Sequence, residues 1–291
     1  MYLKFPNPLN SDKSVIFKDG FFCGQDYKKK ILEYNNNFDG WSEDLTKLHE
    51  GSSEDGNHPI DKYSRENTLN LLGESTENEN ILEIGCASGW LLRDLLEKNS
   101  QINYYGADVL KITLNKLSEK HPNIPFIIFD ISQNPLKNIE FDNIIILNVL
   151  EHIKDDEKAI YEISKLVKKN GKLILEVPAH NFLFDSYDRE LMHFRRYSLK
   201  RIVNLLERNN FKIQKKIYLG SLIFIPFAIV KFFNKIFKKK KRVVADEIKY
   251  SNNLIVKILI NIEKKLKKFS LPFGIRISVI AKKVWKFLIN F

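Results

Sequence analysis

The sequence is poor in cysteine and has no long uncharged apolar run. Two cysteines, Cys23 and Cys86, cannot cross-link 291 residues, so a disulfide scaffold is excluded and a reducing compartment is expected. No uncharged apolar run reaches the roughly 18 residues of a membrane-spanning helix. The first residues lack the basic, then apolar, pattern of a secretory signal. These absences predict a cytoplasmic protein.

Acidic residues are scarce in the last third of the chain. Residues 201–291 hold 22 Lys and Arg against 4 Asp and Glu, whereas residues 1–200 hold 25 against 32, within a net charge of +11. A basic segment attached to an acidic body indicates an anionic partner: nucleic acid, phospholipid headgroups or phosphorylated substrates. With 44% hydrophobic residues, the chain is not wholly disordered.

Strand and helix patterns alternate between residues 58 and 220, after a polar lead-in over 1–57 that predicts loose structure with one short helix. Helices are expected at 59–72, 91–96, 112–117, 155–169 and 198–209. Strands are expected at 81–84, 104–107, 125–129, 141–147, 172–177, 211–218 and, near the end, 272–281. Continuously apolar strands between helices predict an α/β fold with a mostly parallel seven-stranded sheet covered on both faces. Ligands of such sheets bind at the carboxyl ends of the strands.

A loop of small residues joins the first of these strands to a helix, in the sequence Ile-Leu-Glu-Ile-Gly-Cys-Ala-Ser-Gly-Trp at 81–90. Small residues let a ligand approach the backbone, and the helix N-terminus offers free N–H groups. A dinucleotide fingerprint needs glycine at its first, third and sixth positions, which here hold Gly85, Ala87 and Trp90. A tryptophan where the helix must approach a pyrophosphate argues against NAD.

The loop instead resembles the first motif of class I S-adenosylmethionine (SAM) methyltransferases, with Glu83 two residues before Gly85 and a second glycine at Gly89. Asp108 and Asp130 end the next two strands, where the family binds the ribose hydroxyls and the adenine amine. The resemblance implies a Rossmann-like class I methyltransferase fold over 58–220 and SAM as cofactor, with S-adenosylhomocysteine as product. The implied cofactor contacts are Glu83, Gly85, Cys86, Ala87, Gly89, Asp108, Val109, Asp130, Ile131 and Asn148.

Further segments look like a poorly described bacterial subgroup of the type 11/12 methyltransferases; they are 58–61, 147–153, 187–188, 191–197 and 272–276. The resemblance implies a sugar, lipid or small-metabolite acceptor. His193 is a candidate base, and the guanidinium groups of Arg195 and Arg196 suit an anionic acceptor. The predicted catalytic residues are His193 and His152, and the predicted acceptor-binding residues are His180, Asp188, Arg195, Arg196 and Tyr197. In the alternative interpretation, Asp188 forms a structural ion pair with Arg195 or Arg196.

A Glu–His pair, Glu151 and His152, follows the strand at 141–147. In some relatives a similar pair helps bind a divalent metal, usually with another Glu three residues upstream, where this chain has Asn148. A metal would therefore also need His180 or His193. The preferred interpretation has no metal, and the pair shapes the pocket for the methionine part of SAM.

Residues 221–270 form a basic, apolar insertion before a closing strand and tail at 271–291. Residues 217–230 are uncharged, and Lys231, Lys235 and the run 238–242 follow. Apolar residues then recur at helical spacing over 254–266 among lysines. This combination predicts contact with an anionic membrane surface through 217–268. The competing interpretation is an ordinary helix packed on the catalytic body.

Nucleic acid is a disfavoured partner because the aromatic residues of the insertion lie inside an aliphatic run, and are not interleaved with basic residues as in RNA-binding surfaces. The sequence therefore predicts a SAM-dependent methyltransferase that methylates an oxygen of a glycan, lipid or small metabolite at or near a membrane. The alternatives are an RNA methyltransferase and a SAM-binding subunit without catalysis.

Overall fold

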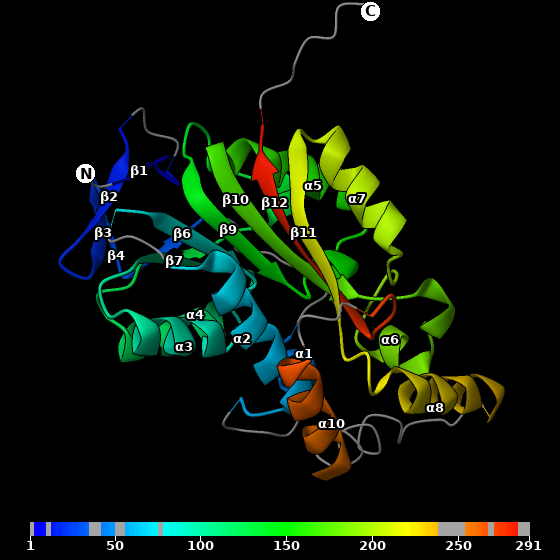
Figure 1. The fold of residues 1–291 in the computed structure, drawn as a ribbon. Helices are drawn as coiled ribbons and strands as arrows, with labels where there is room; N and C mark the ends of the chain where they lie inside the picture. The colour runs from blue at the N-terminus through cyan, green and yellow to red at the C-terminus, as the bar shows by residue number, and fades with distance from the viewer. Residues whose placement is uncertain are drawn as a thin grey trace, which may run out of the picture.

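A computed structural model describes residues 3–9, 13–34, 42–49, 56–74, 78–237, 254–266 and 271–284 (Figure 1). An eight-stranded sheet runs through the molecule in the order β11-β12-β10-β9-β6-β7-β8-β5. Only β12 is antiparallel to its neighbours β10 and β11; the other pairs are parallel. The strands are β5 (Ile31–Glu33), β6 (Asn80–Ile84), β7 (Asn103–Asp108), β8 (Phe126–Ile128), β9 (Phe141–Leu147), β10 (Val167–Pro178), β11 (Phe211–Leu219) and β12 (Arg276–Lys283).

Both faces of the sheet are buried, as the apolar strands predict. In β9, Ile144 and Ile146 belong to one hydrophobic cluster, whereas Ile145 belongs to the other. Successive side chains of a strand point to opposite faces, so the two clusters lie on the two sides of the sheet. This confirms the Rossmann-like α/β fold.

Helices cover each face (Figure 1). On one face, α2 (Pro59–Leu72), α3 (Trp90–Lys98) and α4 (Lys111–Lys120) contribute leucines to the cluster that contains Ile145. On the other, α5 (Asp156–Leu166) and α7 (Leu199–Arg208) pack on the cluster that contains Ile144. Shorter elements are α1 (Glu43–His49), α6 (Ser186–Glu190), η1 (Ile131–Gln133), η2 (Leu150–His152) and η3 (Asn181–Leu183).

The expectation of a loosely structured lead-in is wrong. Four short strands form an antiparallel sheet, β1 (Lys4–Phe5), β2 (Val15–Lys18), β3 (Phe21–Gly24) and β4 (Tyr27–Lys29), and β5 adds an eighth strand to the seven expected in the main sheet. Phe5 and Phe22 are fully buried and meet edge to face, with their centroids 5.6 Å apart. Burial of these aromatic side chains on the main core stabilises strands that are too short to be stable alone.

The helix expected at 155–169 is shorter than predicted. It ends at Leu166, and β10 begins at Val167 with a register shift before Lys172. The turn residues Asn170 and Gly171, which are typical of a helix end, lie inside this irregular strand start, where Asn170 has a φ of 65°.

The insertion contains two described helices, α8 (Phe224–Phe237) and α10 (Leu254–Lys265), and the second confirms the helix expected at 254–266. Ile223 and Ile260 pack with Ile60 and Tyr63 of α2. Because β11 runs parallel to β10, α8 starts at the carboxyl-end edge of the sheet (Figure 1). The run 238–242 lies outside the described residues. Within the described ranges, none of the helices has the length and apolar character that crossing a bilayer demands.

Candidate active site

A cavity of about 440 Å³ lies at the carboxyl ends of the parallel strands. Its wall is made by residues that follow β6, β7, β8 and β9, and by α2, which covers one side. This is the position at which sheets of this type bind ligands, and the volume is ordinary for a small-molecule site.

The loop after β6 bends sharply at two glycines. Gly85 has a φ of 79°, and a Cβ atom there would lie 2.2 Å from Cγ2 of Val149. Gly89 has a φ of 75° at the start of α3, and a Cβ atom there would lie 2.6 Å from Cδ2 of Leu117. Neither position tolerates a side chain without displacement, so the loop keeps its backbone open to the cavity.

Two strand-end carboxylates face the cavity. Oδ2 of Asp108 accepts a hydrogen bond from the Ala87 amide at 3.0 Å, and Oδ1 accepts one from the Leu110 amide at 2.9 Å. Burial raises the pKa of Asp108, and these backbone donors oppose the rise. Asp130 accepts hydrogen bonds from the amide and the hydroxyl of Ser132, which fix its carboxylate at the start of η1.

Glu83 is buried in β6 and accepts a hydrogen bond from the hydroxyl of Tyr104. Burial raises its pKa to about 7, although the Tyr104 hydrogen bond works in the opposite direction. Of the predicted cofactor contacts, Gly89 does not line the cavity; those that do are Glu83, Gly85, Cys86, Ala87, Asp108, Val109, Asp130, Ile131 and Asn148. The site thus combines an open glycine bend with two strand-end carboxylates, Asp108 and Asp130, and this combination fits the nucleoside of SAM.

Sequence reasoning missed the wall that α2 supplies. Ser64 and Arg65 line the cavity together with Arg276, from the start of β12. The Arg276 guanidinium donates to Ser64 Oγ at 2.9 Å and to Glu176 Oε1 at 3.2 Å, and it also pairs with Asp61. The segments 58–61 and 272–276 stand out only by resemblance, because no local pattern shows that residues so distant in sequence share one wall.

The predicted acceptor side meets the same cavity at His152, Met192 and Phe194. His193 does not line the cavity; it lies behind His152, with the ring centroids 4.6 Å apart and the planes at 76°. The fold therefore brings both predicted catalytic histidines together, but only His152 borders the cavity.

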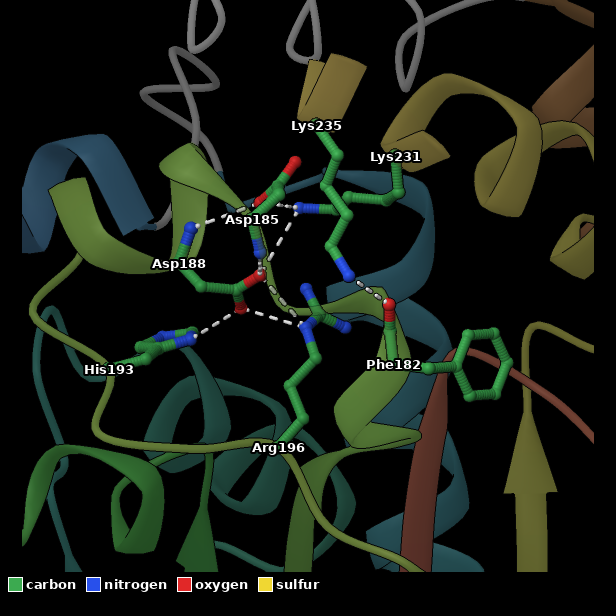
Figure 2. A network of polar contacts seen from close by, with 7 residues as sticks. All are labelled: Phe182, Asp185, Asp188, His193, Arg196, Lys231 and Lys235. Carbon is green, nitrogen blue, oxygen red and sulfur yellow. Dashed lines mark hydrogen bonds and ion pairs between the residues drawn. The ribbon is translucent and has the colours of Figure 1, made fainter. Parts of the chain in front are cut away.

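A buried ion network holds His193 (Figure 2). Nδ1 of His193 lies 2.9 Å from Oδ1 of Asp188, and Nε of Arg196 donates to both oxygens of Asp188 at 2.8 and 3.0 Å. Lys231, from α8, is fully buried and lies 2.8 Å from Asp185 Oδ1 and 3.5 Å from Asp188 Oδ2. Burial alone would raise the pKa of Asp188, but the His193 hydrogen bond and the charges of Arg196 and Lys231 hold it well below its usual range.

This network corrects one prediction. The sequence places Lys231 among the cations that face an anionic surface, yet its side chain points inward and carries an internal ion pair. Burying a lysine without a carboxylate partner is costly, and here Asp185 and Asp188, at the start of α6, provide that partner.

The other predicted acceptor residues contact the protein itself. Arg195 donates to the carbonyls of Ile153 and Lys154, and the Tyr197 hydroxyl lies 3.0 Å from Asp156 Oδ2. His180 stacks on Tyr218, with a centroid separation of 5.4 Å. None of these side chains, nor those of Asp188 and Arg196, lines the cavity, so their role in acceptor binding stays a prediction.

Comparison with known proteins agrees with this geometry. A profile of the family described as "Methyltransferase domain" matches residues 57–216, more than half of the chain. The malonyl-[acyl-carrier protein] O-methyltransferase of Halalkalibacterium halodurans is 25% identical over 146 residues, covering 46% of this chain and 54% of that protein. The tRNA U34 carboxymethyltransferase of Pseudoalteromonas atlantica is 31% identical over 108 residues, covering 35% of this chain and 33% of that protein. The chain spans 6% to 66% of the length of the first curated relatives it matches.

Solved structures share the fold. A putative methyltransferase from Bacillus halodurans superposes with a TM-score of 0.52 at 17% identity, covering 75% of this chain and 98% of that one. The putative methyltransferase in complex with the Haloferax volcanii Trm112 activator superposes with a TM-score of 0.54 at 12% identity, covering 83% of this chain and 94% of that one. The matched family domain, which covers more than half of the chain, and the Rossmann-like sheet with a cavity at its carboxyl ends lead to the same conclusion: the chain belongs to the methyltransferase-domain family.

Proposed function

We propose that this enzyme transfers the methyl group of SAM to an oxygen of a glycan, lipid or small-metabolite acceptor, at or near an anionic membrane surface. The observation that carries the proposal is a single cavity with two unlike walls. One wall holds Asp108 and Asp130, and the other holds His152, Met192 and Phe194. A cofactor bound on the first wall leaves the second for an acceptor.

SAM supplies a methyl group on a positively charged sulfur, which needs a well-placed nucleophile more than elaborate catalysis. We assign the ribose hydroxyls to Asp108 and the adenine amine to Asp130. On the second wall, we assign the action on an acceptor hydroxyl to His152, which has Glu151 and His193 close to it. Oxygen as the acceptor atom is consistent with the names of two relatives, the malonyl-[acyl-carrier protein] and ubiquinone biosynthesis O-methyltransferases.

The membrane part of the proposal is based on exposed apolar side chains of the two insertion helices. On α8 these are Ile225, Ile229, Phe232 and Phe233, and on α10 they are Leu254, Ile255, Ile258 and Ile262. The opposite side of α10 packs on α2, so the competing interpretation accounts for its inner residues only. Apolar side chains next to a basic segment are typical of proteins that bind an anionic bilayer from its surface.

Methyl-labelled SAM incubated with lipid, glycan, small-metabolite and RNA fractions tests the reaction. We expect label in a lipid, glycan or small-metabolite fraction, and its loss in Asp108→Asn. Label in RNA, with steep salt dependence, would support an RNA methyltransferase instead. S-adenosylhomocysteine binding with no label in any fraction would indicate a SAM-binding subunit without catalysis.

A further inference from the structure

We infer that Glu151, His152 and His193 bind one divalent transition-metal ion at the acceptor side of the cavity, contrary to the expectation of no metal. One carboxylate oxygen or ring nitrogen from each residue can be chosen so that all three atoms lie within 4.8 Å of one another. A cation about 2.1 Å from each ligand needs these atoms within about 4.2 Å, so small side-chain rotations complete the site.

Unsatisfied polar atoms point to a missing ligand. Glu151 is 1% exposed, and among the described residues neither oxygen of its carboxyl group has a hydrogen-bond partner. His193 is 9% exposed, and its Nε2 atom also has no hydrogen-bond partner among the described residues. Buried polar atoms of this kind are costly and are usually paired, so two unsatisfied groups on residues that lie this close together need an explanation. A bound cation satisfies both.

The surroundings of His193 orient it as a ligand. Asp188 accepts from Nε of Arg196 at both oxygens, so it is a carboxylate and can only accept from His193. The proton of the neutral imidazole is therefore on Nδ1, and Nε2 keeps its lone pair (Figure 2). A histidine whose other ring nitrogen donates to a carboxylate is the usual arrangement of a metal ligand.

The two arginine side chains near this site are paired with carboxylates, which offsets their repulsion of a metal ion. Arg196 is paired with Asp188, and Arg276 is paired with Asp61 and Glu176. Two imidazoles and one carboxylate on a cation also leave coordination positions open, and His152 lies on the cavity wall. The open positions therefore face the acceptor.

The role in the reaction, unlike metal binding itself, depends on the proposed function. The cation polarises the acceptor hydroxyl, which loses its proton to solvent. The new O–C bond forms as the S–C bond breaks, and the electrons of that bond stay on sulfur, giving neutral S-adenosylhomocysteine. An acceptor that fills two open positions would carry a second oxygen beside the methylated hydroxyl.

Co²⁺ titration of the full, untagged chain, freed of metal by a chelator, tests the site. We expect d–d absorption bands that saturate at one equivalent and are displaced by Zn²⁺. Glu151→Gln and His193→Gln should abolish the saturable bands, and Asp188→Asn should weaken binding by about 10- to 100-fold. His121→Gln, at a partly exposed histidine after α4, is the matched control and should bind like the wild type.

S-adenosylhomocysteine affinity is measured in parallel. It should be retained in Glu151→Gln and His193→Gln, which shows that these variants are folded and separates a failed metal site from a failed methyltransferase. Absence of saturable Co²⁺ bands in the wild type, or bands of equal strength in Glu151→Gln and His193→Gln, would overturn the inference.

Discussion

At the scale of single residues, Glu83 and Gly85 show how one short segment serves both stability and binding. Glu83 is buried in the strand, and its carboxyl group accepts a hydrogen bond from the neutral hydroxyl of Tyr104. Two residues later, Gly85 turns the backbone into a conformation that other residues rarely adopt. Glu83 therefore makes the stability of the fold depend on pH. Gly85 makes the loop intolerant of substitution by any residue with a side chain.

Glu83 should make the cofactor-free protein less stable as the pH rises. Its pKa is raised to about 7 from 4.5, so the folded state binds a proton that the unfolded state releases between these values. Stability from this group is complete below about pH 4.5 and is lost as pH rises to about 7, by about 3 kcal/mol. Denaturant unfolding of wild type and Glu83→Gln across this range should show the difference in unfolding free energy changing by that amount. A difference independent of pH would contradict the assignment.

Gly85→Ala should lose affinity for S-adenosylhomocysteine. Its Cβ atom would lie 2.2 Å from Cγ2 of Val149, and both residues line the cavity, so the loop or the Val149 side chain must shift at the cavity wall. Gly73→Ala is the matched control, because Gly73 has a similar φ of 76°, but a Cβ atom added there would have no described atom within 4 Å. Both variants should lose about 1–3 kcal/mol of stability, because alanine is strained at a positive φ of this kind. Calorimetry should find weaker binding in Gly85→Ala only, and equal affinities would contradict the role of the loop.

At the scale of elements, a buried ion pair between α8 and the start of α6 links the insertion to the region of the candidate active site. Lys231 inserts between Asp185 and Asp188, and its ammonium group also lies over the Tyr187 ring. The same Asp188 orients His193. The insertion is therefore not a separate appendage, because one of its helices completes the network behind the predicted catalytic histidines (Figure 2).

Lys231→Met should destabilise the protein, because it leaves the buried Asp185 without its cation. Loss of one partner of a buried pair costs about 3–5 kcal/mol. Lys235→Met is the control: Lys235 lies one turn further along α8, is exposed and contacts only the Phe182 carbonyl among the partners drawn in Figure 2. It should cost less than about 1 kcal/mol. Chemical denaturation of both variants measures the difference, and equal losses would show that Lys231 is not a structural anchor.

At the scale of the whole molecule, helix α8 lies beside the edge of the sheet that is formed by the carboxyl ends of the parallel strands (Figure 1). Four of its apolar side chains are exposed. A membrane that held these side chains would hold the enzyme with that edge near the bilayer. An acceptor anchored in the same bilayer would then reach the cavity without leaving the surface.

Sedimentation with vesicles tests this arrangement. The wild type should bind vesicles with anionic lipid and lose binding at high salt, because cations near an anionic surface contribute about 1 kcal/mol each. Phe232→Ser with Phe233→Ser should bind weakly, since both side chains are more than half exposed. Tyr161→Ser, an exposed aromatic on α5, is the control and should bind normally. No binding to anionic vesicles, or equal binding by all three proteins, would remove the membrane from the proposal.

The sequence by itself determined seven of the eight strands of the main sheet, together with the bend and the acids that we assign to the cofactor. Strand patterns, the bend at Gly85 and the acids Asp108 and Asp130 depend on neighbours within a few residues, so local sequence is enough to place them. Only the tertiary structure decided which distant groups meet: Glu151 and His152 with His193, Lys231 with Asp185. Burial makes these partners find each other, because a charge or a lone pair removed from water must be satisfied by whatever the fold brings near.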